Sequence, residues 1–181
     1  KQKTAYEYIG DWSSDVCSSD LLAYGTHTYE LFAYRTWSFA LLLFMASQSA
    51  GKIGVGIITA IVSLITVSGM IASLVGASLC LRFGRHRVIA SIGIASAALS
   101  VLVAISLHSG FWPVVIMLWA YNACIMLDSG SLTTGTVEAG DPTDRGALLA
   151  VHSMIGFGGG ALGGPIIGYV LDHGGGVNAL D

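Results

Sequence analysis

The chain has 181 residues, of which 54% are hydrophobic and only 10% are charged, and its formal net charge is −3 at pH 7. A soluble domain of this size carries about a quarter charged residues, and its surface-to-volume ratio is too high to bury so apolar a chain. The small net charge and the three cysteines also argue against a nucleic-acid partner, a disordered chain and a disulfide-stapled module. The composition therefore predicts an integral membrane protein.

The first 21 residues differ from the rest, because they hold six of the nineteen acidic and basic residues and contain no long apolar run. Residues 11–21 (DWSSDVCSSDL) back-translate to codons that resemble a common sequencing adapter, and residues 1–7 (KQKTAYE) resemble the other end of the same adapter family. We therefore treat residues 1–21 as a non-native segment outside the fold prediction, and expect the remainder to be a fragment. The alternative is a genuine polar tail.

From residue 22 onward the chain shows apolar runs of about 20 residues, which is the length that a membrane-spanning helix needs. These runs are too long and too continuous for the alternating pattern of barrel strands. The sequence predicts an all-α, polytopic transmembrane helix bundle with about five spans, namely 29–47, 54–80, 88–107, 111–129 and 147–171.

Basic residues in the short connectors predict the orientation of these spans. The second connector carries Arg82, Arg85 and Arg87 and the fourth carries Arg145, whereas the first has only Lys52 and the third has none. We therefore expect the second and fourth connectors to be cytoplasmic.

The first span has a polar face. His27, Glu30, Tyr34 and Trp37 follow one another at spacings of three and four residues, so a helix places them on one side. Ionisable groups inside a span are costly and indicate a cavity or a partner. Arg35 diverges from Glu30, so we expect each to find partners on neighbouring helices. The alternative places His27 and Glu30 in interfacial water and the aromatic residues in an anchoring belt.

The fourth span repeats this feature with Tyr121, Cys124 and Asp128 on one face. A carboxylate at Asp128 can take up a proton or pair with a cation, although it can also be a helix-end acid in cytoplasmic water. The third span has no ionisable residue within 88–107, which favours a peripheral helix against lipid.

The fifth span is rich in glycine. Gly156, Gly160, Gly164 and Gly168 recur every four residues, a spacing that lets another helix approach closely, and Pro165 should bend the helix. The second span shows a weaker pattern of small residues and is also expected to be an interface helix. His152 is either a proton-responsive group or a packing residue. Cys80 and Cys124 lack metal-ligand spacing, and no catalytic motif occurs, so we expect no metal, cofactor or enzymatic activity.

Residues 79–89 (LCLRFGRHRVI) resemble the signature loop of the major facilitator superfamily of transporters. Arg82, Gly84 and Arg85 match that loop, but Leu81 replaces its acid, which puts the cytoplasmic latch of the family in doubt. Residues 160–168 (GALGGPIIG) resemble the antiporter motif of the family, and residues 23–37 (AYGTHTYELFAYRTW) resemble helix seven of bacterial members. The resemblance implies helices seven to eleven of a twelve-helix carrier, with helices one to five as the alternative.

In that family helices seven and ten line the central cavity, which would give this role to the polar faces of the first and fourth spans. The resemblance implies secondary transport of a small molecule by alternating access, coupled to protons, in a bacterial inner membrane. The expected partners are a substrate, protons, the lipid bilayer and the missing N-terminal half of the same carrier. A sensor or scaffold that has lost transport is the alternative, and the fold does not identify a substrate.

Overall fold

The computed structural model describes residues 15–49, 51, 53–139, 143 and 145–174. This described part is helical and contains no strand, as the sequence predicts. In chain order its elements are α2 (Asp15–Gln48), α3 (Val55–Phe83), α4 (Arg85–Ser106), the short 3-10 helix η1 (Leu107–Ser109), α5 (Phe111–Ala139) and α6 (Arg145–His173).

Four helices are long and apolar enough to cross a membrane, and they identify a multi-pass membrane protein. Their bounds within the described residues are Val55–Phe83, Arg85–Ser109, Phe111–Thr136 and Arg145–His173. They contain the predicted spans 54–80, 88–107, 111–129 and 147–171 almost entirely. Helix α2 is less apolar than these four helices, because it carries His27, Glu30 and Arg35.

The outer faces of the helices are apolar. Leu74 on α3, Ile94 on α4 and Phe157 on α6 each expose 72–74% of their surface. A soluble protein rarely exposes apolar patches of such extent, whereas the lipid of a membrane solvates them. The hydrophobic core instead lies where α2, α3 and α5 meet, around the fully buried Leu42 and Ile58.

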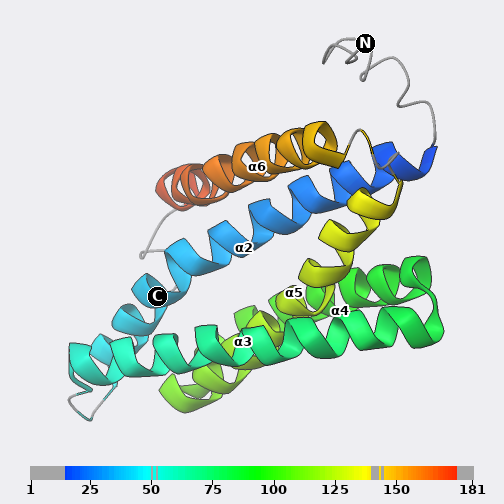
Figure 1. Cartoon of the computed structure of the whole chain (residues 1–181). Coiled ribbons are helices and arrows are strands. Elements are labelled where there is room, and N and C mark those ends of the chain that lie inside the picture. The colour runs from blue at the N-terminus through cyan, green and yellow to red at the C-terminus, as the bar shows by residue number, and fades with distance from the viewer. Residues whose placement is uncertain (1–14, 50, 52, 140–142, 144, 175–181) are drawn as a thin grey trace.

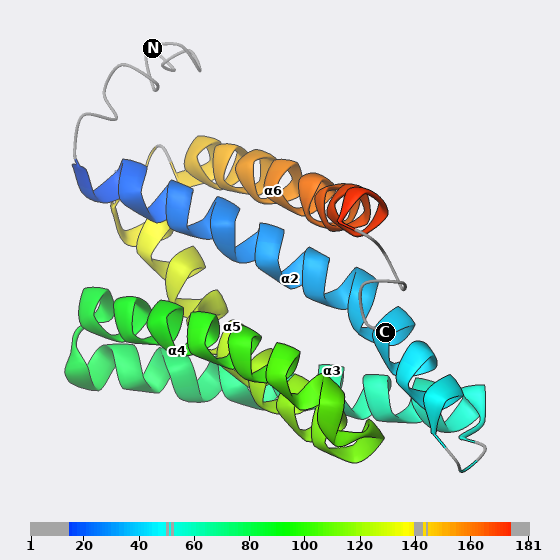
Figure 2. The same ribbon diagram turned by 180° about the vertical axis from the view of Figure 1, so that it is seen from behind.

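The helices form two groups that α5 and α2 connect (Figure 1). Helix α6 lies along α2, while α3 and α4 lie together on the other side of the bundle. Helix α5 packs against α3 and α4 and also contacts α2, and the view from behind shows the same order (Figure 2). Pro165 lies inside α6, which remains one continuous helix.

Two glycines end helices in the left-handed region of the backbone. Gly84 (φ 88°) separates α3 from α4, and Gly110 (φ 95°) lies between η1 and α5. Non-glycine residues rarely adopt this conformation, because a Cβ atom clashes with the backbone there. The second connector is consequently a one-residue break at Gly84, shorter than the polar segment LRFGRHR suggested.

Helix α2 begins earlier than the predicted span 29–47. It already includes residues 15–21, which the sequence analysis set apart as non-native, and Leu21 is buried near Leu148 and Ile155. No glycine or proline interrupts residues 11–24, so nothing in the local sequence ends a helix there. Residues 1–14 of that segment lie outside the described residues.

Candidate functional site

Glu30 is the centre of a polar cluster that joins three helices. Its Oε1 atom accepts a hydrogen bond from the hydroxyl of Tyr121 on α5 at 2.7 Å and another from Ser96 on α4 at 2.5 Å. Arg35, also on α2, is exposed and takes no part in this cluster. Two hydroxyl donors on one carboxylate oxygen stabilise a charge that would otherwise be costly inside the bundle.

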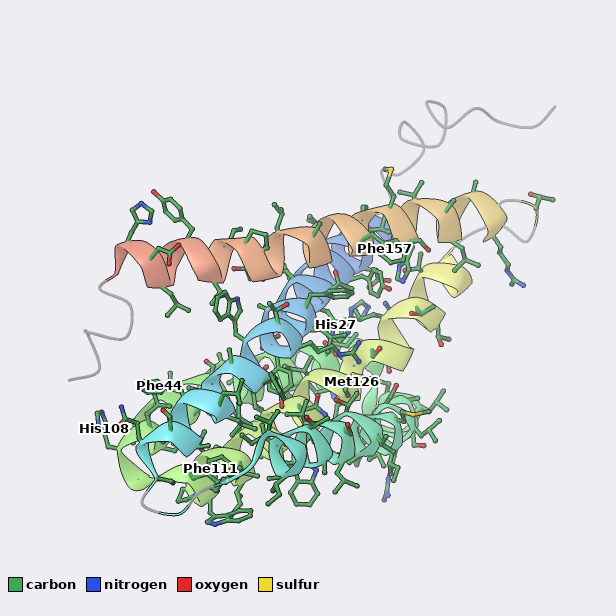
Figure 3. All side chains as sticks on the ribbon, turned by 90° about the vertical axis from the view of Figure 1, so that its left-hand side faces the viewer. His27, Phe44, His108, Phe111, Met126 and Phe157 are labelled. Carbon is green, nitrogen blue, oxygen red and sulfur yellow. The ribbon has the colours of Figure 1, made fainter. Side chains whose placement is uncertain are left out.

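One helical turn from Glu30, His27 on α2 contacts Asp128 on α5. The His27 Nδ1 atom lies 2.9 Å from Oδ1 of Asp128, and the two side chains are 3% and 14% exposed. His27 lies among the helices, whereas His108 and Phe157 lie at the periphery (Figure 3). The polar residues predicted on α2 thus face those predicted on α5: His27 faces Asp128, and Glu30 faces Tyr121.

The two aromatic residues of the predicted face, Tyr34 and Trp37, each donate a hydrogen bond to a neighbouring helix. Tyr34 donates its hydroxyl hydrogen to the carbonyl of Leu118 at 3.1 Å, and Trp37 Nε1 donates to the carbonyl of Gly164 at 3.0 Å. The rings of Tyr34 and Tyr121 pack edge to face with centroids 5.6 Å apart. Aromatic side chains whose polar atoms are already bonded keep a fixed orientation.

A cavity of about 270 Å³ opens beside Glu30, Tyr34, Trp37 and Tyr121. Its wall comes mostly from α2, with contributions from α4, α5 and α6. The other lining residues are Tyr29, Ala33, Ser38, Leu41, Val103, Leu118 and Ile167. Four of the six residues predicted to line a cavity therefore line one, while His27 and Asp128 are not part of this wall.

A larger cavity, of about 490 Å³, lies between α3, α4 and α5 and is bordered by Phe83, Arg87 and Cys124 among others. It has no carboxylate in its wall, and the thiol of Cys124 is directed to the carbonyl of Ile92 at 3.6 Å. The smaller cavity is the better candidate site, because it contains a half-buried acid with specific partners.

His152 lies where α2, α5 and α6 meet. Its ring stacks on Tyr24 with centroids 3.5 Å apart, and its Nδ1 atom is 3.0 Å from the hydroxyl of Thr136. The side chain is 2% exposed. These contacts correspond to the packing role that the sequence left open.

The residues of the signature loop do not converge. Gly84 forms the break between α3 and α4, and Arg82 is exposed, with its guanidinium 5.2 Å from the centre of the Phe83 ring. Arg85 instead turns inward and pairs with Asp20 of α2 at 2.5 Å. This contact joins the start of α2 to the end of the bundle that carries the basic connector.

The glycines of α6 lie against α2. A Cβ atom at Gly156, Gly160 or Gly168 would touch an aromatic side chain of α2, and one at Gly164 would touch Thr36. The two backbones approach most closely at a neighbouring row of glycines on α6, formed by Gly159 and Gly163. There a Cβ at Gly159 would lie 2.3 Å from the carbonyl oxygen of Gly25, and one at Gly163 would lie 2.4 Å from that of Tyr29.

Two polar contacts were not predicted. Ser96 is buried in α4, which the sequence indicated to be a plain peripheral helix, and Asn122 on α5 donates from Nδ2 to the carbonyl of Ile65 at 2.9 Å. Ser96 lies four residues after the buried Ile92, on the same face of α4, but no feature of the sequence distinguishes it from the other serines of this helix.

Comparisons of the chain with family models, with curated proteins and with solved structures found no match.

Proposed function

We propose that the chain is part of a secondary transporter that moves a small molecule across a membrane by alternating access, coupled to protons. The observation that carries the proposal is the Glu30 carboxylate, held by Tyr121 and Ser96 at the wall of a cavity within a bundle of apolar helices. Ionisable residues that face the interior of a membrane helix bundle are costly and commonly mark substrate or ion pathways.

Proton coupling has a physical basis in the two half-buried acids, Glu30 and Asp128. Protonation of Glu30 removes its charge and weakens the hydrogen bonds that join α2 to α4 and α5, since bonds to a charged acceptor are the stronger ones. Protonation of Asp128 similarly weakens its contact with His27. Each acid can therefore bias the packing of α2 against α5, which is the kind of rearrangement that alternating access requires.

The same proposal makes α2 a fifth spanning helix. Its polar face is turned towards α5 and the cavity, so that α2 can cross the bilayer beside more apolar helices. The arrangement supports the assignment of the chain to one half of a major facilitator carrier, as helices seven to eleven, in a bacterial inner membrane. The other half of the carrier would complete the cavity.

Transport measurements test this proposal. The full-length gene, which encodes both proposed halves of the carrier, is expressed in bacteria, and uptake and efflux are followed with labelled sugars, amino acids, organic acids and amines, with and without a proton gradient. We expect Glu30→Gln to reduce proton-driven flux about tenfold or more, which corresponds to about 1.4 kcal/mol or more. Asp128→Asn should also reduce the coupling.

Asp172→Asn is the matched control, because Asp172 is an exposed carboxylate on α6. This variant should transport at the rate of the unmodified protein. Normal coupling in both Glu30→Gln and Asp128→Asn would refute the proposed roles of these acids. Correct membrane insertion without flux of any compound would refute transport and favour a sensor or scaffold.

A further inference from the structure

The cavity beside Glu30 combines one acid with several aromatic rings. Tyr29, Tyr34, Trp37 and Tyr121 all line it together with the carboxylate. The remaining wall is aliphatic apart from Ser38. No lysine, arginine or histidine lines the cavity in the part of the chain that the structure describes.

This composition gives the cavity a negative potential. The carboxylate attracts positive charge and repels anions, and low-dielectric walls strengthen both effects. Aromatic ring faces attract cations in addition, most strongly at tryptophan and tyrosine. The nearest basic residue on α2, Arg35, is exposed and does not line the cavity.

The hydrogen-bond donors of the wall favour a ligand that needs few partners. Tyr34 and Trp37 donate to backbone carbonyls, and Tyr121 donates to Glu30, so these three donors already have acceptors in the protein. The other polar groups of the wall are the hydroxyls of Tyr29 and Ser38 and the Glu30 carboxylate, which are too few for the many hydroxyls of a sugar. Each hydroxyl left without a partner is costly. An alkylated ammonium group has no such requirement.

The fixed orientation of the rings adds to this preference. Tyr34 and Trp37 are anchored through hydrogen bonds to backbone carbonyls of α5 and α6 respectively, and not to Glu30. Both hydrogen bonds to Glu30 converge on Oε1, so neither hydroxyl occupies Oε2. A site that is ordered before binding loses less entropy when the ligand enters.

We infer that the cavity binds a small organic cation, of the chemical class of the alkylammonium ions, with Glu30 as the counter-ion and the aromatic rings around the charge. The volume of about 270 Å³ suits a compact cation. This inference deepens the proposed transport function and rests on it for its physiological meaning, but the binding itself can be measured without transport.

The test compares choline with 3,3-dimethylbutan-1-ol, its neutral isostere, in which carbon replaces the quaternary nitrogen. The 181-residue chain is placed in lipid nanodiscs, and the binding of both compounds is measured by calorimetry. We expect choline to bind about tenfold more tightly or better. Equal binding of the two compounds, or no binding of choline, would overturn the inference.

Two matched pairs of variants locate the site. Glu30→Gln should weaken choline binding about tenfold or more, whereas Asp172→Asn should leave it unchanged. Trp37→Leu should weaken it several-fold, whereas Trp112→Leu should not, because Trp112 is 60% exposed at the start of α5 and does not line the cavity. Circular dichroism verifies that each variant is folded. Unchanged binding in both Glu30→Gln and Trp37→Leu would refute the site.

The outcome also separates this inference from the transport proposal. If the carrier moves only neutral or anionic compounds and choline does not bind, transport is retained and the cation site is refuted. If choline binds with the expected pattern of variants but no compound is transported, the cation site is supported and the transport proposal fails.

Discussion

Glu30 and Asp128 show two ways to stabilise an acid inside a helix bundle. Glu30 is bound by two hydroxyl groups, which are neutral and leave the net charge in place. Asp128 lies next to His27, which can neutralise the pair when it is protonated. Glu30 therefore has neutral hydrogen-bond donors as partners, whereas the partner of Asp128 is a side chain that can itself carry charge.

The His27–Asp128 contact should contribute to stability as a pair. His27→Leu leaves Asp128 without this partner, so we expect a loss of about 1–3 kcal/mol in the free energy of unfolding. Adding Asp128→Asn should recover part of that loss, because the remaining group is then uncharged. The measurement is unfolding in mixed SDS micelles, followed by circular dichroism, for the single and double variants.

His108→Leu is the control for this cycle, because His108 is exposed in η1 and should change stability by no more than about 0.5 kcal/mol. Strictly additive losses in the double variant would show that the two side chains do not interact.

In the part of the chain that the structure describes, α2 and α6 make the most extensive contact between two helices. Glycine permits their close approach. At Gly159 and Gly163 even a methyl group would meet the backbone of α2, which has no rotamer to change. Lipid supplies no hydrophobic drive for helix association, so close packing has to provide the attraction. The packing of α3 on α5 follows the same rule, because a Cβ at Gly76 would collide with the carbonyl group of Leu127.

Gly163→Ala tests this contact. Its methyl group would lie 2.4 Å from the carbonyl oxygen of Tyr29 and 2.8 Å from the nitrogen of Ala33, so α6 has to move away from α2. We expect a loss of about 1–3 kcal/mol in SDS unfolding, as for other overpacked sites. Gly158→Ala adds the same methyl group to the same helix with nothing within 4 Å, and should be neutral. Helix propensity favours alanine over glycine, so it cannot cause a loss at either position. A loss at Gly158 as large as that at Gly163 would refute the packing explanation.

Helical periodicity explains which of these features could be predicted. The face shared by His27, Glu30 and Tyr34 and the spacing of the α6 glycines are local properties, so they follow from 3.6 residues per turn. The partners are not local. That Ser96 reaches Glu30 depends on how α4 crosses α5. Helix α4 contains four serines, and nothing in the sequence singles out this one.

The predictions for the ends of helices were less accurate for a similar reason. Polar residues suggested a loop around Arg85 and a start of the first helix near Tyr29. Both stretches are helical instead, because no residue there except Gly84 breaks a helix. The close approach of α6 fell on Gly159 and Gly163, next to the predicted stripe. Several parallel glycine rows exist on that helix, and only the position of α2 selects one of them.

For the molecule as a whole, the arginines next to helix ends lie at one end of the bundle, namely Arg82, Arg85, Arg87 and Arg145. The break at Gly84 places Arg85 next to the start of α2, where it pairs with Asp20, and the connector from α5 to α6 lies at this same end of the bundle (Figure 1). The η1 turn lies at the opposite end of α4. Short connectors that carry arginine remain in the cytoplasm, so this arrangement predicts a single orientation for all the spans.

Cysteine accessibility tests that orientation. All three cysteines of the chain are first replaced by serine. In this background, His86→Cys and His108→Cys then place single thiols at exposed positions near the opposite ends of α4. Because α4 is long and apolar enough to span the bilayer, these thiols should lie on opposite sides of the membrane. A membrane-impermeant maleimide applied to intact spheroplasts should modify the cysteine at 108 and not the one at 86. Permeabilisation should make both reactive, which is the internal control. Labelling at 86 alone in intact spheroplasts would place the arginine-rich turn outside the cell, and the basic residues would then not determine the topology.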